Sequence, residues 1–219
     1  MNKLQWILFG SMIAVIVIAA ISIILIKLKI KKLQAKYLNQ DREQTYLMLQ
    51  NLRNDIGQLP FDLKDYLKND YKPYDIEAVI NTIYTNNFQS TLIIDNQDSF
   101  LSSVVSNKTK RKIYYLNEYD FSEQLKEAIS EYPQDLENTN LISYSQNMLD
   151  FVVIFKNNKT LMELFDTYFD FMISKSMMMI LTDNYSKKEL VKFVKHIKTL
   201  GLTYEISYVE SKFLYIVKQ

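Results

Sequence analysis

The longest apolar pattern in the chain is an uncharged run near its amino-terminal end. Residues 4–26, LQWILFGSMIAVIVIAAISIILI, carry no charge, and a helix needs ~20 such residues to cross the hydrocarbon core of a membrane. A cleaved signal peptide has a shorter apolar region of ~7 to 15 residues and a small-residue cleavage site, which does not follow this run. The pattern therefore predicts an uncleaved transmembrane helix within residues 1–30.

Lysines gather on the carboxyl side of this run. They occupy positions 27, 29, 31, 32 and 36, whereas Lys3 flanks the other side. Because cytoplasmic flanks carry the excess of positive charge, we expect a single-pass protein of the cell membrane whose carboxyl-terminal domain is cytoplasmic. Such a cluster also attracts anionic lipid, although a role in setting the membrane topology is enough to explain these lysines.

A polar, helix-prone segment follows at residues 31–59. Its apolar positions have the 3-4-3 spacing of one helix face. These positions are Leu49, Leu52, Ile56 and Leu59, and the punctuating residues after them are Gly57 and Pro60. The stripe is too short for a coiled coil, which needs three or four heptads. We expect a juxtamembrane helix that packs on the domain or acts as a stalk.

From residue 60 onward, short apolar segments alternate with amphipathic ones. The apolar segments are 92–95, 113–116, 141–144, 151–155 and 177–181, and they have the continuous apolar character of strands covered on both faces. The chain closes with TYEISYVESKFLYIVKQ, in which two strand-like segments flank a short turn. We therefore expect one α/β domain over residues 60–219, with a Rossmann-like, doubly wound, mainly parallel sheet and a C-terminal antiparallel hairpin.

The segments between the strands carry helix signals. One early face consists of Ile76, Val79, Ile80 and Ile83, and a later one of Leu161, Leu164, Phe165, Tyr168, Phe169 and Met172. Three pairs have the spacing of a capping box, in which each side chain bonds the other residue's backbone amide. These pairs are Asp120 with Glu123, Thr160 with Glu163, and Ser186 with Glu189. They predict three helix starts.

Composition narrows the possible chemistry. A hydrophobic content of 48% supports a real core, and the net charge of +1, from 26 basic and 25 acidic residues, creates no overall field that would draw nucleic acid. No nucleic-acid partner is expected.

With no cysteine and a single histidine, thiolate nucleophiles and zinc sites of the usual kind are excluded. That histidine, His196, lies off the apolar stripe of its helix and is interpreted as a surface residue.

Three segments carry a family resemblance. TLIIDNQDSF at residues 91–100 is an apolar strand that ends in an acid, Asp95; LDFVVIF begins at Leu149, and MMMILTDN begins at Met177. In order and spacing, residues 75–219 resemble the class I S-adenosylmethionine-dependent methyltransferases, whose seven-stranded sheet ends in such a hairpin. Membrane-anchored, cysteine-poor methyltransferase-like proteins of this outline occur in wall-less bacteria, and the chain is similar to them.

The resemblance implies S-adenosylmethionine as the cofactor. In the first turn the implied cofactor-binding residues are Asp95, Asn96 and Gln97, and the amino-acid end of the cofactor would meet the side chains of Gln97, Asp98 and Ser99. Asp95 also fits an Asx-type cap of that turn, and Asn96 is a residue type that adopts the left-handed conformation readily. Of the three glycines in the chain none is near this turn, and Gln97 and Ser99 stand where the family has glycines.

The remaining cofactor contacts follow the second and third strands. In dinucleotide folds the ribose-binding acid lies ~20 residues beyond the first turn, and Glu118 stands 23 residues after Asp95. Asn117 is its neutral competitor, and Glu118 also fits an ordinary loop acid. Gln146 and Asn147 correspond to the adenine contacts, and they equally fit a polar loop.

Other positions depart from the family. FKNNK supplies Phe155, Lys156 and Asn157 where the O-methyltransferase branch has metal-binding acids, so no metal is expected. Asp150 is expected to cap the start of the fourth strand, and Asp183 to lie at the carboxyl edge of the sheet. No residue is assigned a catalytic role.

The chain is thus expected to be a membrane-anchored S-adenosylmethionine-dependent methyltransferase with an unknown acceptor, which is a small molecule, a lipid or a protein. The alternative is a catalytically inactive scaffold or binding domain at the membrane, which the missing glycines favour. A receiver-like regulatory module fits less well, because the terminal hairpin does not belong to that fold.

Overall fold

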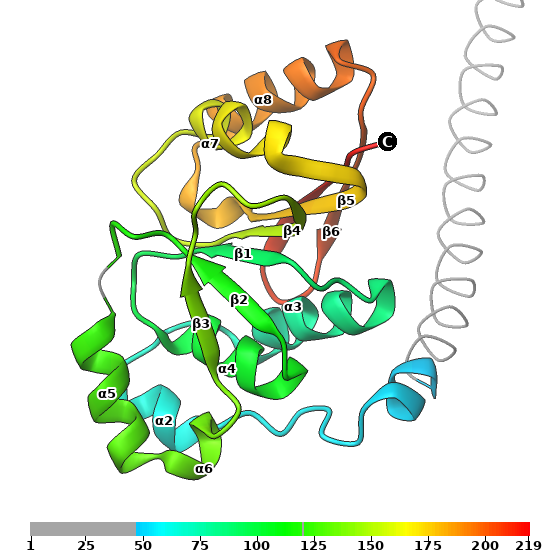
Figure 1. Cartoon of the computed structure of the whole chain (residues 1–219). Helices are drawn as coiled ribbons and strands as arrows, with labels where there is room; N and C mark the ends of the chain where they lie inside the picture. The colour runs from blue at the N-terminus through cyan, green and yellow to red at the C-terminus, as the bar shows by residue number, and fades with distance from the viewer. Residues whose placement is uncertain (1–46, 120) are drawn as a thin grey trace, which may run out of the picture. The chain divides into compact units, whose positions relative to one another are not determined.

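The computed structural model describes residues 47–119 and 121–219 (Figure 1). The chain divides into two compact units, 1–54 and 55–219. The predicted transmembrane run at residues 4–26 lies outside the described residues. Within the described ranges, no helix has the length and the apolar character that a membrane crossing requires.

The expected juxtamembrane helix ends earlier than its apolar spacing indicated. Residues 47–52 are helical, and residues 53–60 form turns and irregular chain, so Ile56 and Leu59 do not continue a helical stripe. The reason is local: Gly57 has φ +78°, which no α-helix accommodates, and the amide of Gln58 donates to the Asp55 carbonyl at 3.1 Å to close a turn.

The second unit is built around a seven-stranded sheet of order β3-β2-β1-β4-β5-β7-β6. The strands are β1 (Thr91–Ile94), β2 (Lys112–Tyr115), β3 (Asn140–Ser143), β4 (Leu149–Ile154), β5 (Met172–Leu181), β6 (Thr203–Tyr208) and β7 (Lys212–Val217). Strands β1 to β5 pair in parallel, whereas β7 runs antiparallel to both β5 and β6. The predicted mainly parallel sheet with a terminal antiparallel hairpin is confirmed.

Strand β5 is longer than expected. It begins at Met172 instead of Met177, and its pairing with β4 shifts register between Leu149 and Phe151. Lys175, within the added segment, has φ +65°, a left-handed value that one type of β-bulge also has. Met172 was expected on the preceding helix and lies in the strand instead, because that helix ends at Tyr168.

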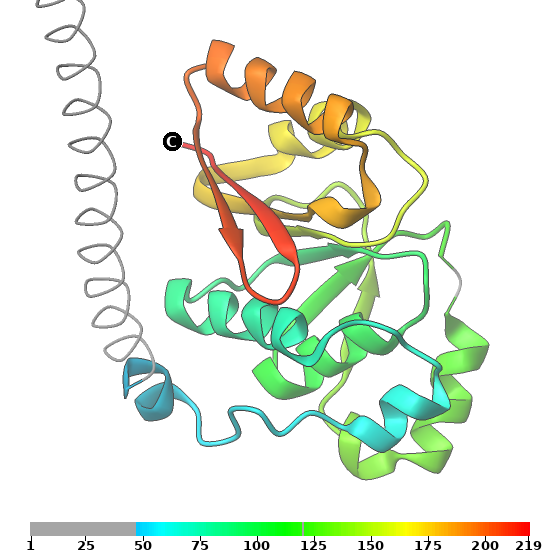
Figure 2. The same cartoon turned by 180° about the vertical axis from the view of Figure 1, so that it is seen from behind.

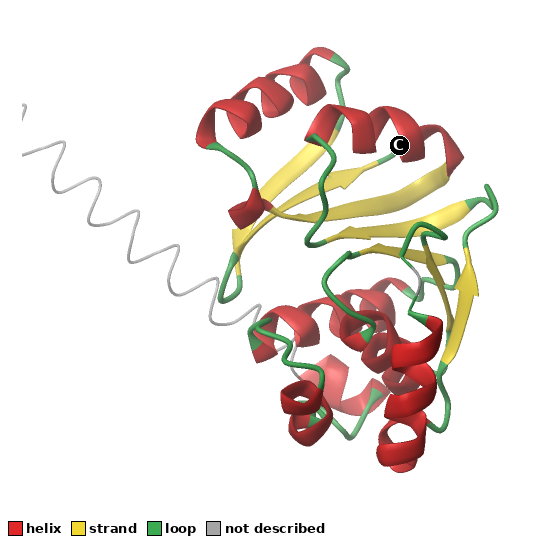
Figure 3. Ribbon diagram, turned by 90° about the vertical axis from the view of Figure 1, so that its left-hand side faces the viewer, coloured by secondary structure: helices red, strands yellow, loops and turns green. Residues whose placement is uncertain are grey.

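Helices cover both faces of the sheet (Figures 1 and 3). They are α2 (Phe61–Tyr66), α3 (Pro73–Asn86), α4 (Phe100–Thr109), α5 (Ser122–Glu131), α6 (Pro133–Leu136), α7 (Leu161–Tyr168) and α8 (Lys187–Thr199), with short 3-10 turns η1 (Phe169–Phe171) and η2 (Thr182–Asn184). Helices α7 and α8 lie on one face, and α2 to α6 lie on the other. Figure 2 shows the hairpin of β6 and β7 at one edge of the sheet.

Each face of the sheet has its own apolar core. Ile93 packs with the helices α3 and α4, whereas its neighbours Leu92 and Ile94 pack on the opposite side, with α7 and α8. All four residues of β1 are buried, which explains why the strand reads as one continuous apolar run. The predicted apolar face of α3 is completely buried; it consists of Ile76, Val79, Ile80 and Ile83.

Two of the expected capping boxes begin a helix. Thr160 and Glu163 form a complete box at the start of α7. Ser186 accepts a hydrogen bond from the Glu189 amide at 3.2 Å, but the Glu189 carboxylate accepts from the Leu161 amide at 2.9 Å instead of returning to Ser186. Glu189 therefore connects α8 to the start of α7.

The third expected box pairs Glu123 with a residue outside the described part of the chain. Helix α5 begins at Ser122, its N-cap is Phe121, and no side chain caps it. Glu123 is consequently the second helical residue, one position too early for the partner in a capping box. Asp120 itself lies outside the described residues.

Candidate functional site

The turn after β1 occupies the point where the strand order reverses. The chain proceeds from β1 to β2 and β3 on one side, and then crosses to β4 on the other side of β1. Ligands of open α/β sheets bind outside the carboxyl ends of the strands at such a switch point. Residues 95–99, which follow β1 and precede α4, lie there.

Asp95 is the centre of this turn and is 1% exposed. Its Oδ1 accepts hydrogen bonds from the Tyr71 hydroxyl at 2.5 Å and from the Gln97 amide at 3.1 Å. Burial raises the pKa of Asp95 to about 7, although the hydrogen bonds from Tyr71 and Gln97 oppose that rise. The Asx-type turn is confirmed, and it leaves Oδ2 without a partner among the described residues.

A second buried carboxylate, Asp98, closes the same turn. Its two oxygens accept from Asn69 Nδ2 at 3.1 and 3.0 Å, and Oδ1 also accepts from the Phe100 amide at 2.8 Å. The Asp98 carboxylate thus accepts the first amide of α4. Burial raises the pKa of Asp98. The Asn69 side chain in turn accepts from the Tyr71 amide, so the segment before α3 is fixed against the turn.

The turn forms without glycine and without strained backbone. Throughout residues 95–99, all of which are described, φ is not positive, and Ser99 has φ −82°. Asn96 does not adopt the left-handed conformation that its residue type allows, and its amide donates to the Lys156 carbonyl at 2.9 Å. Because the carboxylates of Asp95 and Asp98 accept the amides of the turn, Gln97 and Ser99 fit where the family has glycines.

Four buried side-chain oxygens in the described part of the chain lack a hydrogen-bond partner, and all of them belong to this region. They are Asp95 Oδ2, Gln97 Oε1, Ser99 Oγ and Ser103 Oγ. An unpaired buried polar group costs about 1 to 3 kcal/mol. Three of them lie in the turn of residues 95–99, and Ser103 lies one turn into α4.

An ion pair joins two loops near this turn. Lys156, which follows β4, donates to both Asp70 oxygens at 2.9 Å, and its Nζ lies 5.5 Å from the centre of the Tyr71 ring. The hydrogen bond from Lys156 lowers the pKa of Asp70. The lysine therefore holds the loop before α3 against the end of β4.

Glu118, the expected ribose ligand, is paired with Lys159. Its Oε1 lies 2.8 Å from Lys159 Nζ, and the two side chains are 50% and 37% exposed. Because Glu118 follows β2 and Lys159 follows β4, on either side of β1, this ion pair crosses the end of β1. An exposed pair of this kind contributes less than about 1 kcal/mol, so a ligand hydroxyl can compete for Glu118. Asn117, its competitor, accepts a hydrogen bond from the Ser143 hydroxyl.

Gln146 and Asn147 lie in the loop after β3 and are exposed. Gln146 has φ +61°, and the Asn147 carbonyl accepts from the Tyr144 hydroxyl at 3.0 Å. Strand β3 is two positions from β1 in the sheet, a separation of roughly 10 Å. Both residues are thus at the carboxyl edge but apart from the Asp95 turn, and their role as adenine contacts stays a prediction.

Three tyrosines of the carboxyl edge were not predicted as site residues. Burial raises the pKa values of Tyr119, Tyr168 and Tyr185 to about 12, and Tyr119 lies close enough to Asp95 and to the other two rings to interact with them electrostatically. They keep their protons at neutral pH and add an aromatic surface beside the turn. Tyrosines in the sequence gave no signal of this clustering, because they are frequent throughout the chain.

Of two further acids, Asp150 differs from its expected role, whereas Asp183 follows the end of β5 at the carboxyl edge, as expected. Asp150 accepts hydrogen bonds from the amides of Gln89 at 2.5 Å and Ser90 at 2.9 Å. Asp150 therefore caps the turn that leads into β1 and not the start of its own strand, β4. This is possible because β1 and β4 are neighbours and begin side by side. Asp183 lies in η2 and is exposed. Within residues 47–119 and 121–219, no three acidic or histidine side chains are grouped to hold a metal.

Comparisons with known proteins connect this geometry to a fold. No family model matches the sequence, and no curated protein matches it. Solved structures match its fold. The methyltransferase PaMTH1 from Podospora anserina, bound to S-adenosylhomocysteine, has a TM-score of 0.56 at 13% identity and covers 73% of this chain and 87% of its own. A methyltransferase from Geobacter sulfurreducens has a TM-score of 0.55 at 8% identity, covering 81% and 98%.

A third solved structure is the O-methyltransferase from Bacillus cereus in complex with S-adenosylhomocysteine. It has a TM-score of 0.50 at 10% identity and covers 72% of this chain and 89% of its own. Together with the strand order, these likenesses show that residues 55–219 have the class I methyltransferase fold.

Proposed function

We propose that the domain binds S-adenosylmethionine and transfers its methyl group to an acceptor of unknown identity. The observation that carries the proposal is the set of four unpartnered buried oxygens, three in the turn after β1 and one at Ser103 on α4. The amino-acid end of the cofactor has an ammonium donor and a carboxylate acceptor. Asp95 and Gln97 supply acceptors for the first, and the hydroxyls of Ser99 and Ser103 supply donors for the second, so the residues present fit the group.

The remaining contacts follow from the carboxyl edge of the sheet. Glu118 would accept from the ribose hydroxyls once Lys159 releases it, and Gln146 and Asn147 would meet the adenine. When bound, the cofactor supplies an electrophilic methyl group. The residues of this chain hold and orient it beside the acceptor, which accelerates transfer by proximity.

We further propose that the protein is anchored in the cell membrane with its domain in the cytoplasm, like the membrane-anchored proteins of wall-less bacteria that its sequence resembles. The support is the uncharged run at residues 4–26 and the lysines after it. Protease treatment of intact cells tests the orientation. Digestion of the domain in unopened cells would contradict it.

Calorimetry tests the cofactor site. Residues 55–219 form a compact unit with its own core, and we expect this fragment to release or absorb heat on binding S-adenosylmethionine and S-adenosylhomocysteine. Asp95→Asn should weaken binding at least tenfold, because a charge-assisted hydrogen bond contributes about 1.5 to 3 kcal/mol. Asp183→Asn is the matched control and should leave the affinity unchanged.

The same experiment separates the enzyme from the scaffold. No binding heat at millimolar ligand would refute the cofactor site and leave the alternative of an inactive methyltransferase-like scaffold at the membrane. Equal weakening by Asp95→Asn and Asp183→Asn would show that the loss reflects net charge and not the Asp95 turn.

A further inference from the structure

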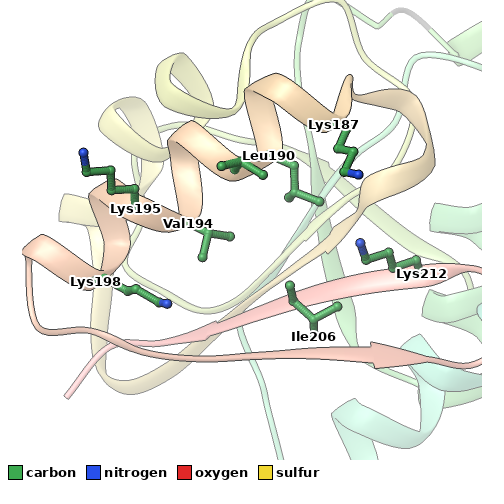
Figure 4. Close-up of a pocket in the computed structure, with 8 residues that line it drawn as sticks. Lys187, Leu190, Val194, Lys195, Lys198, Ile206 and Lys212 are labelled. Atoms are coloured by element: carbon green, nitrogen blue, oxygen red, sulfur yellow. The ribbon is translucent and has the colours of Figure 1, made fainter. Parts of the chain in front are cut away.

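A second hollow lies between α8 and the hairpin of β6 and β7, apart from the turn after β1. It is a groove of about 340 Å³ with a basic rim and an apolar floor (Figure 4). The rim includes Lys187 and Lys198 on α8 and Lys212 on β7, and the floor includes Val191, Val194 and Ile206.

The groove is formed by the side of α8 that borders its buried face: Leu190 is buried and also lines the groove, and Val194 packs partly against the core. Leu190, Phe193 and Ile197 of the helix are buried against the sheet. The positions 187, 191, 194 and 198 recur at three- and four-residue intervals and so share the bordering face. Val191 on that face is 62% exposed, and Ile206, opposite it on the edge strand β6, is 38% exposed.

Among the described residues, the lysines on the rim of the groove have no carboxylate partner. Helix α8 has five lysines and one acid, Glu189, and the Glu189 carboxylate is directed to the Leu161 amide. Within the described residues, no ion pair involves Lys187, Lys198 or Lys212. Lys198 and Lys212 instead lie over the rings of hairpin tyrosines, 5.7 and 5.9 Å from the ring centres.

We propose that this groove face docks on the surface of an anionic lipid membrane. Lysine ammonium groups would meet the lipid phosphates, and the apolar floor would enter the interface, together with Tyr208 and Val209 of the hairpin, which are 68% and 41% exposed. The combination of lysines with exposed apolar side chains is the chemistry of helices that lie in a membrane interface. A soluble anion would use the lysines but not the apolar floor.

The proposal rests on the membrane anchoring proposed above and is independent of the cofactor. A domain tethered to a bilayer meets it at a high effective concentration, so a weak contact suffices for docking. Each lysine close to an anionic surface favours the docked state roughly fivefold. A few lysines therefore shift the orientation of the tethered domain.

The absence of cysteine allows a specific test. The full-length chain with Val191→Cys, labelled with an environment-sensitive fluorophore, is reconstituted in vesicles of phosphatidylcholine with or without phosphatidylserine. We expect a blue-shifted emission in the anionic vesicles alone. A label at Glu131→Cys, exposed on α5 over the opposite face of the sheet, should not shift. Equal emission of the Val191 label in both kinds of vesicle would overturn the proposal.

Matched charge variants test whether the groove is the docking surface. Lys187→Gln with Lys198→Gln should lower the ratio of docked to undocked protein roughly thirtyfold. Lys188→Gln with Lys192→Gln removes the same charge from exposed positions of α8 outside the groove and should have a much smaller effect. Equal losses would indicate general electrostatic attraction and refute the groove. Thermal unfolding of both variants checks that the fold is retained.

Two controls separate this proposal from the others. A chain that floats with neutral vesicles but shows no emission change in anionic ones retains its anchor and lacks docking. A chain that fails to float with neutral vesicles lacks the anchor on which the weak docking contact depends, and that result overturns both proposals. A Val191 shift of equal size with inorganic phosphate and no vesicles would show a soluble-anion site and overturn the membrane surface. Cofactor binding is measured separately, by calorimetry.

Discussion

Replacing Asp95 by Asn distinguishes a carboxylate kept for ligand binding from one kept for stability. Burial raises the pKa of Asp95 to about 7, from an ordinary value of 3.8. The folded state thus holds this proton more tightly than the unfolded state does. The stability linked to the group is complete below the unfolded pKa and is lost as the pH rises through the folded pKa. Asn cannot ionise, so the variant should not show this loss.

The expected magnitude follows from the same pKa. At about pH 5.5 the carboxyl is protonated in the fold and ionised in the unfolded chain, so each pH unit up to about 7 lowers the unfolding free energy by about 1.4 kcal/mol. Between about pH 5.5 and about pH 8, Asp95→Asn should therefore gain about 2 kcal/mol over the natural sequence. The Asn side chain of the variant leaves its Nδ2 without a partner, which costs unfolding free energy. This cost is the same at both pH values, so it cancels when the two stability differences are compared.

Urea unfolding of residues 55–219, followed by far-ultraviolet circular dichroism at both pH values, measures the difference. The reasoning is refuted if the stability difference between Asp95→Asn and the natural sequence is the same at both pH values. It is also refuted if the variant loses relative stability at the higher pH, because Asp95 would then be an ionised, stabilising carboxylate in the folded protein.

Three further predictions concern the same domain. S-adenosylhomocysteine should bind roughly tenfold more tightly at about pH 7 than at about pH 5.5, because its ammonium requires ionised Asp95; a flat calorimetric pH profile would contradict this. Glu118→Ala should weaken binding about tenfold or more and leave the melting temperature almost unchanged, since its pair with Lys159 is half exposed; an unchanged affinity would mean that the ribose lies elsewhere. Thr160→Ala removes the capping box with Glu163 and should lower the unfolding free energy by about 1 kcal/mol, measured by urea unfolding.

The sequence predicted the sheet because strands covered on both faces leave continuous apolar runs. The central strand β4 is the clearest case, since its last four residues are completely buried. The first half of β5 was missed because its sequence, MISKS, is polar and contains the left-handed residue Lys175. The helix expected up to Ile56 was overestimated for the opposite reason: its apolar spacing was suitable, but the backbone at Gly57 is not helical.

The candidate site was predicted only where one short segment defines it. Asp95 was found because an acid at the end of an apolar strand has a fixed place at the carboxyl edge of the sheet. Asn69 and Tyr71 were missed because their contacts reach 29 and 24 residues along the chain, to Asp98 and Asp95. No local spacing reports such contacts, since the position of the loop before α3 is set by tertiary packing.

The missing glycines do not exclude cofactor binding, but they change which groups of the turn would contact the cofactor. A glycine-rich turn offers backbone amides at close range. Here the carboxylates of Asp95 and Asp98 accept the Gln97 and Phe100 amides, so the turn is held in place while side-chain oxygens stay unpaired. Recognition would then depend on a carboxylate whose pKa is about 7, and pH becomes a variable of binding. A bound ligand that pairs with these oxygens would stabilise the domain, and the calorimetric test separates this from the scaffold alternative.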